Sequence, residues 1–117
     1  MDVGEWRHWE RLIDERGIVI DRPRGHAHPV YPDMIYPWDY GHVPGTSAAD
    51  GEEVDVFVGA VPSGLVGLVS LTRKPSGVSE PKLLVNLSRR DADDIVAFLD
   101  RGHPPPDLDL IRRDPAA

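Results

Sequence analysis

Hydrophobic positions recur with a helical period near the N-terminus of this chain. Between residues 5 and 16, four apolar side chains fall on one face of a helix: Trp6, Trp9, Leu12 and Ile13. Gly17 follows as a stop signal, so the pattern predicts an amphipathic helix over 5–16. We expect its tryptophans to cover an open side of the domain or a subunit contact, with ligand stacking as the alternative.

A second helix is predicted near the C-terminus. Ser88 and Asp91 have the spacing of a capping box, and an apolar face follows them until Gly102 ends the helix. The segment 103–117 then begins with consecutive prolines, which favours an extended tail. Its apolar residues up to Ile111 are expected to pack back onto the domain.

Four short segments between the two helices have the composition of strands: 18–20, 54–58, 65–71 and 82–87. In the second of them valines alternate with Asp55 and Phe57, so Asp55 points away from the valine face. The turn sequence Lys74-Pro-Ser-Gly77 separates the last two segments, which can therefore form a hairpin.

The segment 26–46 has prolines at positions 29, 32, 37 and 44, with aromatic residues between them. These prolines exclude a long helix and disfavour a central strand. We expect an ordered, irregular loop, and loops held by a rigid scaffold often carry functional groups. His26 and His28 lie on the same side of this stretch, either as ordinary loop histidines or as ligands for phosphate or a softer metal ion.

Composition narrows the class of protein. With 117 residues the chain has the length of a single domain, 1–117, around one core. A formal charge of -7 opposes nucleic-acid binding, and no apolar run is long enough to span a membrane. The chain lacks cysteine, which excludes disulfides and thiolate zinc sites, and no export signal is visible, so we expect a cytoplasmic protein.

The segment Asp50-Gly-Glu-Glu-Val-Asp55 places four carboxylates close together at a turn before a predicted strand. Because like charges repel, either solvent screens them or a bound cation offsets them. Taken alone, the segment is more typical of a solvated turn. A calcium loop fits poorly, since the glycine comes second and the required series of ligands does not follow.

The context of this cluster changes its interpretation. Three ordered motifs resemble the signature of soluble (family I) inorganic pyrophosphatases: Tyr36-Pro-Trp-Asp-Tyr40-Gly41, Pro44-Gly-Thr46 and Asp50-Gly-Glu-Glu-Val-Asp55-Val56. The resemblance implies a mainly β fold with α elements, namely an OB-like five-stranded barrel packed with a C-terminal helix. The N-terminal helix is then an addition. It also implies Mg²⁺, or Mn²⁺ or another divalent cation, and hydrolysis of pyrophosphate to two phosphates by a metal-activated water.

The same resemblance implies the catalytic residues. Asp50 and Asp55 match metal ligands in type. Glu52 stands where the family has an aspartate that holds metal ions and accepts a proton from the water. Tyr40 matches a tyrosine near the phosphate or the metal ligands. The implied catalytic set is Glu52, Asp55 and Tyr40.

Further positions are implied to contact the substrate or a metal ion. Tyr36 and Lys82 match substrate-binding positions, although Tyr36 is as well explained as a core aromatic. Glu80 replaces an aspartate that binds metal. Three arginines are candidates for phosphate binding because a guanidinium pairs bidentately with phosphoryl oxygens: Arg22, Arg24 and Arg73.

The chain also departs from the family pattern. Lys74-Pro75-Ser76 stands where the family has a further Asp-Glu pair, and Glu53 replaces a proline. Two functions therefore stay open beside pyrophosphate hydrolysis: a non-catalytic domain that binds metal or phosphate, and hydrolysis of another small diphosphate. Family members often form oligomers, and the tryptophan face of the N-terminal helix is compatible with a homo-oligomer.

Overall fold

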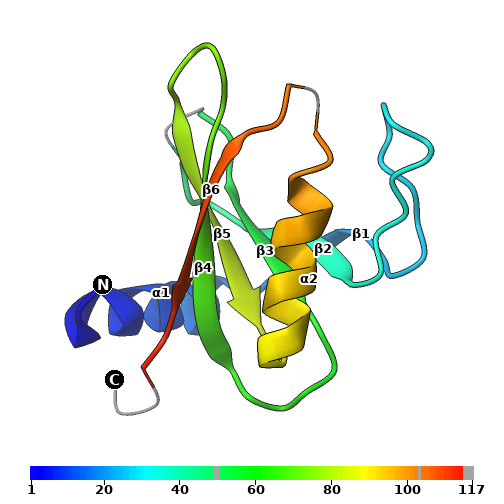
Figure 1. Ribbon diagram of the computed structural model, residues 1–117. Helices are drawn as coiled ribbons and strands as arrows, with labels where there is room; N and C mark the ends of the chain where they lie inside the picture. Colours follow the sequence, from blue (N-terminus) through cyan, green and yellow to red (C-terminus); the bar gives the residue numbers. More distant parts are fainter. Residues whose placement is uncertain (49–50, 103, 115–117) are drawn as a thin grey trace.

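The computed structural model describes residues 1–48, 51–102 and 104–114. Its elements follow one another in the order α1 (Val3–Arg16), β1 (Val19–Arg22), β2 (Asp39–Val43), β3 (Val54–Val58), β4 (Leu65–Thr72), β5 (Ser79–Val85), α2 (Arg89–Leu99) and β6 (Asp107–Arg112). The fold is mainly β with two helices, as predicted (Figure 1). No helix in the described ranges is long and apolar enough to cross a membrane.

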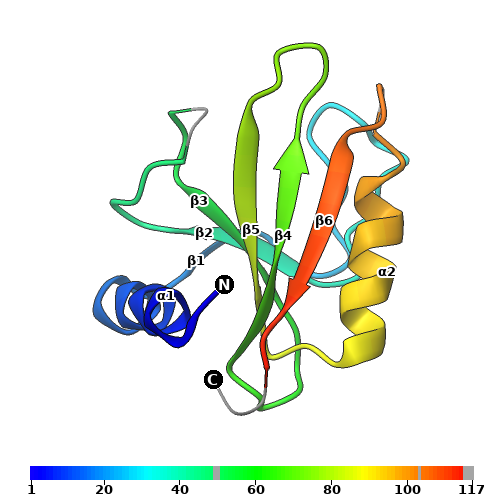
Figure 2. The same cartoon turned by 60° about the vertical axis from the view of Figure 1, so that its left-hand side comes forward.

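The six strands form one sheet in the order β1-β2-β3-β5-β4-β6, in which β3 and β5 are parallel and the other neighbours are antiparallel. The sheet has one strand more than expected and is not closed into a barrel, since β1 and β6 are its two edges within the described ranges. The predicted hairpin is confirmed as β4 and β5. The predicted extended C-terminal segment forms β6 along β4 (Figure 2).

The expectation that the segment 26–46 disfavours a central strand is wrong, because β2 lies between β1 and β3. Pro37 and Pro44 flank this strand rather than interrupt it, so its backbone amides stay available for pairing. Gly41 explains how β1 packs so closely: a Cβ at this position would lie 1.9 Å from the carbonyl oxygen of Val19.

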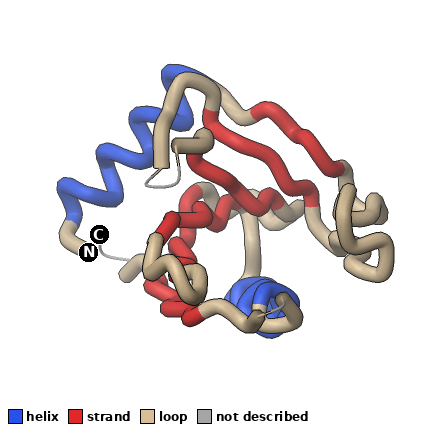
Figure 3. The backbone as a smooth tube through the Cα atoms, turned by 90° about the horizontal axis from the view of Figure 1, so that it is seen from above, coloured by secondary structure: helices blue, strands red, loops and turns tan. Residues whose placement is uncertain are grey.

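Buried side chains gather in two clusters on opposite faces of the sheet, instead of in the single core expected from length. In β3, Val56 belongs to one cluster and Phe57 to the other, as the period of two requires. Helix α1 covers the valine face through Trp6, which is 1% exposed. Helix α2 covers the opposite face through Phe98, and Figure 3 shows the two helices on the two sides of the bent sheet. Trp6 therefore caps the domain itself.

Local signals fix helix α2 in place. The Ser88 hydroxyl accepts a hydrogen bond from the Asp91 amide at 3.0 Å, and the Asp91 carboxylate accepts one from the Ser88 amide at 2.9 Å. This is the predicted capping box. The helix ends at Leu99, whose carbonyl accepts the amide of Gly102. The C-terminal end of α2 lies beside the loop between β1 and β2 (Figure 1).

Candidate active site

One cavity of about 460 Å³, here called the central cavity, lies on the α2 face of the sheet. Among the described residues, every predicted site residue except Arg24 lines it: Arg22, Tyr36, Tyr40, Glu52, Asp55, Arg73, Glu80 and Lys82. Arg24 is not among its lining residues; its backbone amide instead binds the Asp39 carboxylate. Asp50 lies outside the described residues.

Three of these residues form a closed hydrogen-bonded group. The Lys82 ammonium donates to Asp55 Oδ2 at 2.7 Å and to the Tyr40 hydroxyl at 2.8 Å. That hydroxyl donates to the same Asp55 oxygen at 2.6 Å. The sheet register explains the group, because Asp55 of β3 lies opposite Lys82 of the parallel strand β5. Tyr40 comes from β2, the other neighbour of β3.

The Tyr40 phenol is protonated at neutral pH. Burial raises the pKa of Tyr40 far above that of a free phenol, and the negative charge of Asp55 beside it adds to the increase. The ring is buried against Phe57, with centroids 4.8 Å apart. Tyr40 is therefore a fixed donor that orients the Asp55 carboxylate.

Arg22 brings a second positive charge into the cavity. Its Nη1 donates to the Tyr36 hydroxyl at 2.8 Å, and its guanidinium carbon lies 5.2 Å and 5.1 Å from the ring centroids of Tyr36 and Tyr40. Burial raises the pKa of Tyr36, although Arg22 opposes part of this effect. A guanidinium has five N–H donors, so Arg22 can hold this phenol and still donate to a ligand.

Two cationic side chains, Arg73 and Lys82, lie beside the Glu80 carboxylate. It is 4% exposed, and its Oε1 accepts from Arg73 Nη2 at 2.6 Å and lies 3.8 Å from the Lys82 ammonium. A buried carboxylate requires such compensation. In this geometry Glu80 neutralises Arg73 and Lys82, and its role as a metal ligand stays a prediction.

His28 also lines the central cavity, whereas His26 is not among the lining residues. His28 Nδ1 accepts hydrogen bonds from the backbone amides of Val30 and Tyr31. The His28 ring stacks on that of Tyr36, with centroids 6.3 Å apart. Desolvation lowers the pKa of His28, and Arg22 and Lys82 lower it further. The neutral ring, with Nδ1 accepting, therefore keeps its proton on Nε2.

Sequence reasoning left the role of His28 open and did not single out Asp21, which lines the same cavity. The proline-aromatic surroundings of His28 were a usable signal for the histidine. No sequence signal marks Asp21, because it follows directly after the predicted short strand 18–20, where a turn is expected. In the structure its Oδ2 binds His42 Nδ1 at 2.7 Å across the β1–β2 pair.

The donor chemistry of the cavity suits a hard divalent cation, because its carboxylates offer the oxygen ligands that Mg²⁺ prefers. The arrangement is incomplete, however. Within the described ranges, no three His, Cys, Asp or Glu side chains lie close enough together to hold a metal ion. Asp55 and Glu80 are engaged by cationic side chains, and Asp50 lies outside the described ranges. The described residues alone therefore do not form a metal site.

Comparisons with known proteins identify the family. A sequence model of the family described as inorganic pyrophosphatase matches residues 14–80, more than half of the chain. A comparison with curated proteins gave no significant match. An inorganic pyrophosphatase from Coxiella burnetii is similar in structure, with a TM-score of 0.59 and 20% identity over 83% of this chain and 84% of that chain.

The inorganic pyrophosphatase of Helicobacter pylori is similar to the same extent, with a TM-score of 0.56 and 20% identity over 82% of this chain and 80% of that chain. At such identities the likeness concerns the fold, and it matches the OB-like fold that the motifs implied. The family match spans the tyrosine segment, the acidic cluster and the β4–β5 turn. The chain therefore belongs to the inorganic pyrophosphatase family, and its family and fold together assign it to the inorganic diphosphatases, hydrolases of a phosphoric anhydride.

Proposed function

We propose that this chain hydrolyses inorganic pyrophosphate to two phosphates in the central cavity, with the help of divalent cations. The observation that carries the proposal is the convergence of Arg22, Arg73 and Lys82 on one cavity that also contains Asp55. Pyrophosphate is highly anionic, and catalysis of phosphoryl transfer consists mainly of positioning and charge stabilisation. The cavity offers both.

The cationic side chains would bind the phosphoryl oxygens. Lys82 is 4% exposed and positioned by Asp55 and Tyr40, so it presents its charge with little loss of conformational entropy on binding. Arg22 is held against two tyrosine rings, and Arg73 is held by Glu80. Guanidinium groups match phosphoryl oxygens bidentately. Neutral His28 adds an Nε2–H donor that does not depend on protonation at neutral pH.

Cation binding is proposed to involve Asp50, Glu52 and Asp55, with Glu80 as a further ligand. When bound, Mg²⁺ or Mn²⁺ would neutralise phosphoryl charge and lower the pKa of a coordinated water. Tyr40 and Lys82 fix the orientation of the Asp55 carboxylate, because both donate hydrogen bonds to its Oδ2. Glu52 lines the same cavity and is proposed as the acceptor of the proton from the attacking water.

The test is phosphate release from pyrophosphate with Mg²⁺, with Mn²⁺ and with a chelator, for the parent chain and for Asp55→Asn. We expect cation-dependent turnover in the parent and a loss of at least a hundredfold in the variant. Asp14→Asn is the matched control, because Asp14 is an exposed residue of α1. Its turnover should equal that of the parent.

Thermal melting distinguishes catalysis from binding alone. A ligand that prefers the folded state raises the melting temperature. If cations or phosphate raise the melting temperature but pyrophosphate is not cleaved, the chain binds these ligands without turnover, and the proposal of hydrolysis is wrong.

A further inference from the structure

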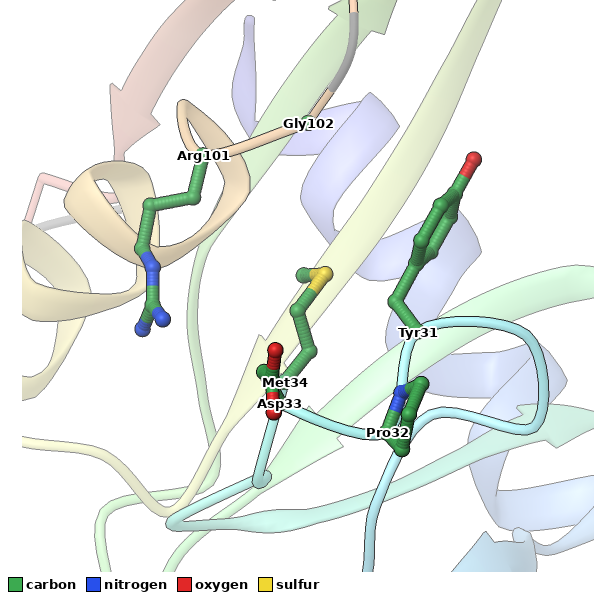
Figure 4. Close-up of a pocket in the computed structure, with 6 residues that line it drawn as sticks. All are labelled: Tyr31, Pro32, Asp33, Met34, Arg101 and Gly102. Carbon is green, nitrogen blue, oxygen red and sulfur yellow. The ribbon is translucent and has the colours of Figure 1, made fainter.

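A second cavity of about 440 Å³, here called the adjoining cavity, opens next to the central cavity. It lies between the loop that joins β1 to β2 and the C-terminal end of α2 (Figure 4). Tyr31, Met34 and Gly102 line both cavities, so the two share a wall. Pro32, Asp33 and Arg101 line the adjoining cavity but not the central one.

The side chains near this shared wall favour contact with an organic group over contact with phosphate. Tyr31 is 47% exposed, and its ring lies 5.0 Å from that of His28, so an aromatic face is presented beside the phosphate-binding groups. Met34 adds a flexible thioether, which adapts to irregular apolar shapes. Figure 4 shows Met34 between Tyr31 and Arg101. An inorganic anion contains no carbon and gains nothing from these side chains.

The size of the two spaces leads to the same conclusion. Cavities of about 300–1,000 Å³ hold ligands of drug size. The central cavity alone falls in this range, and the adjoining cavity nearly doubles the room. The proposed pyrophosphate site takes up only the part near Arg22, Asp55 and Lys82. The adjoining cavity offers further space along Tyr31, Pro32 and Met34, and Asp33 and Arg101 are its charged lining residues.

We propose that the chain also takes organic diphosphates, of the type in which one end of the diphosphate is esterified to a flat or apolar group. The diphosphate would occupy the central cavity and the organic group the adjoining cavity, against Tyr31 and Met34. A nucleoside diphosphate and an alkyl diphosphate are the two sources of this chemistry. The inference rests on the proposed function, since it uses the same phosphate-binding residues.

The reaction follows from that placement. The oxygen of a water molecule forms a bond to the terminal phosphorus, and the bond from that phosphorus to the bridging oxygen breaks. The bridging oxygen leaves on the organic monophosphate, and the terminal phosphorus leaves as orthophosphate. The protons of the water are divided between these products and the solvent, so that no oxidant or further reactant is needed.

Binding is measured by calorimetry with three probes whose bridging oxygen is replaced by methylene, so that none is cleaved. They are methylenediphosphonate, the corresponding analogue of a nucleoside diphosphate, and that of an alkyl diphosphate. We expect at least one substituted analogue to bind tenfold more tightly than methylenediphosphonate. Phosphate release from the matching hydrolysable diphosphates, with Mg²⁺, should follow the same order in kcat/KM.

Two variants locate the organic group. Tyr31→Ala should weaken binding of the substituted analogue about tenfold, whereas Tyr31→Phe, which keeps the ring, should restore it. Arg101→Ala should weaken the substituted analogue and leave methylenediphosphonate unchanged, because Arg101 lines the adjoining cavity and not the central one. Arg90→Ala, at an exposed position of α2, is the matched control and should change neither affinity.

The outcomes separate the two proposals. If pyrophosphate is hydrolysed but both substituted analogues bind no more tightly than methylenediphosphonate, the organic substrate is excluded and the proposed function stands. If the substituted analogue binds tightly but Tyr31→Ala and Arg101→Ala have no effect, the adjoining cavity is the wrong location and the inference is overturned. If none of the probes binds and no diphosphate is cleaved, the proposed function fails as well.

Discussion

Lys82 holds a positive charge where water hardly reaches. Its ammonium lies 2.7 Å from Asp55 Oδ2 and 3.8 Å from Glu80 Oε1, and the residue is 4% exposed. Burial of an ammonium costs several kcal/mol unless an opposite charge offsets it. The two carboxylates supply that compensation, and Lys82 in turn stabilises them. Stability and phosphate recognition therefore depend on the same side chain.

We expect Lys82→Met to lower the free energy of unfolding by about 3 kcal/mol, because it leaves Asp55 without its cation and removes one of the two cations beside buried Glu80. The value lies at the low end of the usual range, since the Asp55 side chain is 28% exposed and solvent screens part of its charge. Urea unfolding measures the loss. Adding Asp55→Asn should recover part of it, because the second change removes an uncompensated carboxylate. Equal losses in the single and double variants would contradict this account.

The residue types at Tyr40, Asp55 and Lys82 could be predicted from the motifs, but their shared hydrogen bonds could not. Contact among them depends on the order of the strands, in which β3 lies between β2 and β5. The partnership of Glu80 was equally hidden. Arg73 reaches Glu80 across the β4–β5 turn, where Leu71 pairs with Glu80 in register. The spacing of residues along the sequence does not reveal this strand register.

At the level of secondary structure, β2 joins several residues of the central cavity to the rest of the sheet. It carries Tyr40 toward the cavity and His42 two positions later, and it pairs with β1, which ends at Arg22. The sequence did not predict this strand, because the prolines on either side of it made the whole segment 26–46 unfavourable for a central strand. The pattern did predict β3, β4, β5 and α2, whose apolar periods are longer or bounded by clear turn and capping signals.

The close contact between β1 and β2 makes Gly41→Ala informative. A methyl group at Gly41 would collide with the backbone of Val19, so β1 must shift. We expect a loss of about 1–3 kcal/mol in unfolding free energy, typical of overpacking. Amide hydrogen exchange in residues 19–22 should accelerate more than tenfold. Gly4→Ala, in α1, is the control, since the added methyl meets only an ordinary contact of 3.4 Å there. Unchanged exchange in β1 would show that the strand adjusts without cost.

His42 should make this pairing depend on pH. Its Nδ1 binds Asp21 at 2.7 Å and its Nε2 lies 3.3 Å from Glu53, so the hydrogen bond to Asp21 and the neighbouring negative charges raise the pKa of His42 in the folded state. The stabilisation is complete below the unfolded pKa of about 6.5 and is lost as the pH rises through the higher folded pKa. Melting temperatures of the parent and His42→Gln should therefore differ most near pH 6 and converge toward pH 9. A constant difference across that range would contradict the assignment.

In the whole molecule, two buried clusters lie on either side of one sheet. Neighbouring residues of the central strands belong to different clusters: Leu83 to the cluster beneath α1 and Leu84 to the cluster beneath α2. Neither cluster can lose its packing without disturbing a strand that the other requires. The sequence predicted a single core, because a count of apolar residues does not reveal that they divide between the two faces of a sheet.

This shared sheet predicts that the two faces unfold together. Trp6 belongs to the α1 cluster and Trp38 to the α2 cluster, so each reports on one face. We expect the fluorescence midpoint in urea to equal the midpoint of far-ultraviolet circular dichroism in each of two variants, Trp6→Phe with Trp9→Phe and Trp9→Phe with Trp38→Phe. Comparing the two probes within one variant removes the effect of the substitutions on stability. A fluorescence transition that precedes the dichroism change in either variant would mean that one face unfolds first. If it occurs in the variant that keeps Trp38, the site on the α2 face can open while the α1 face stays folded.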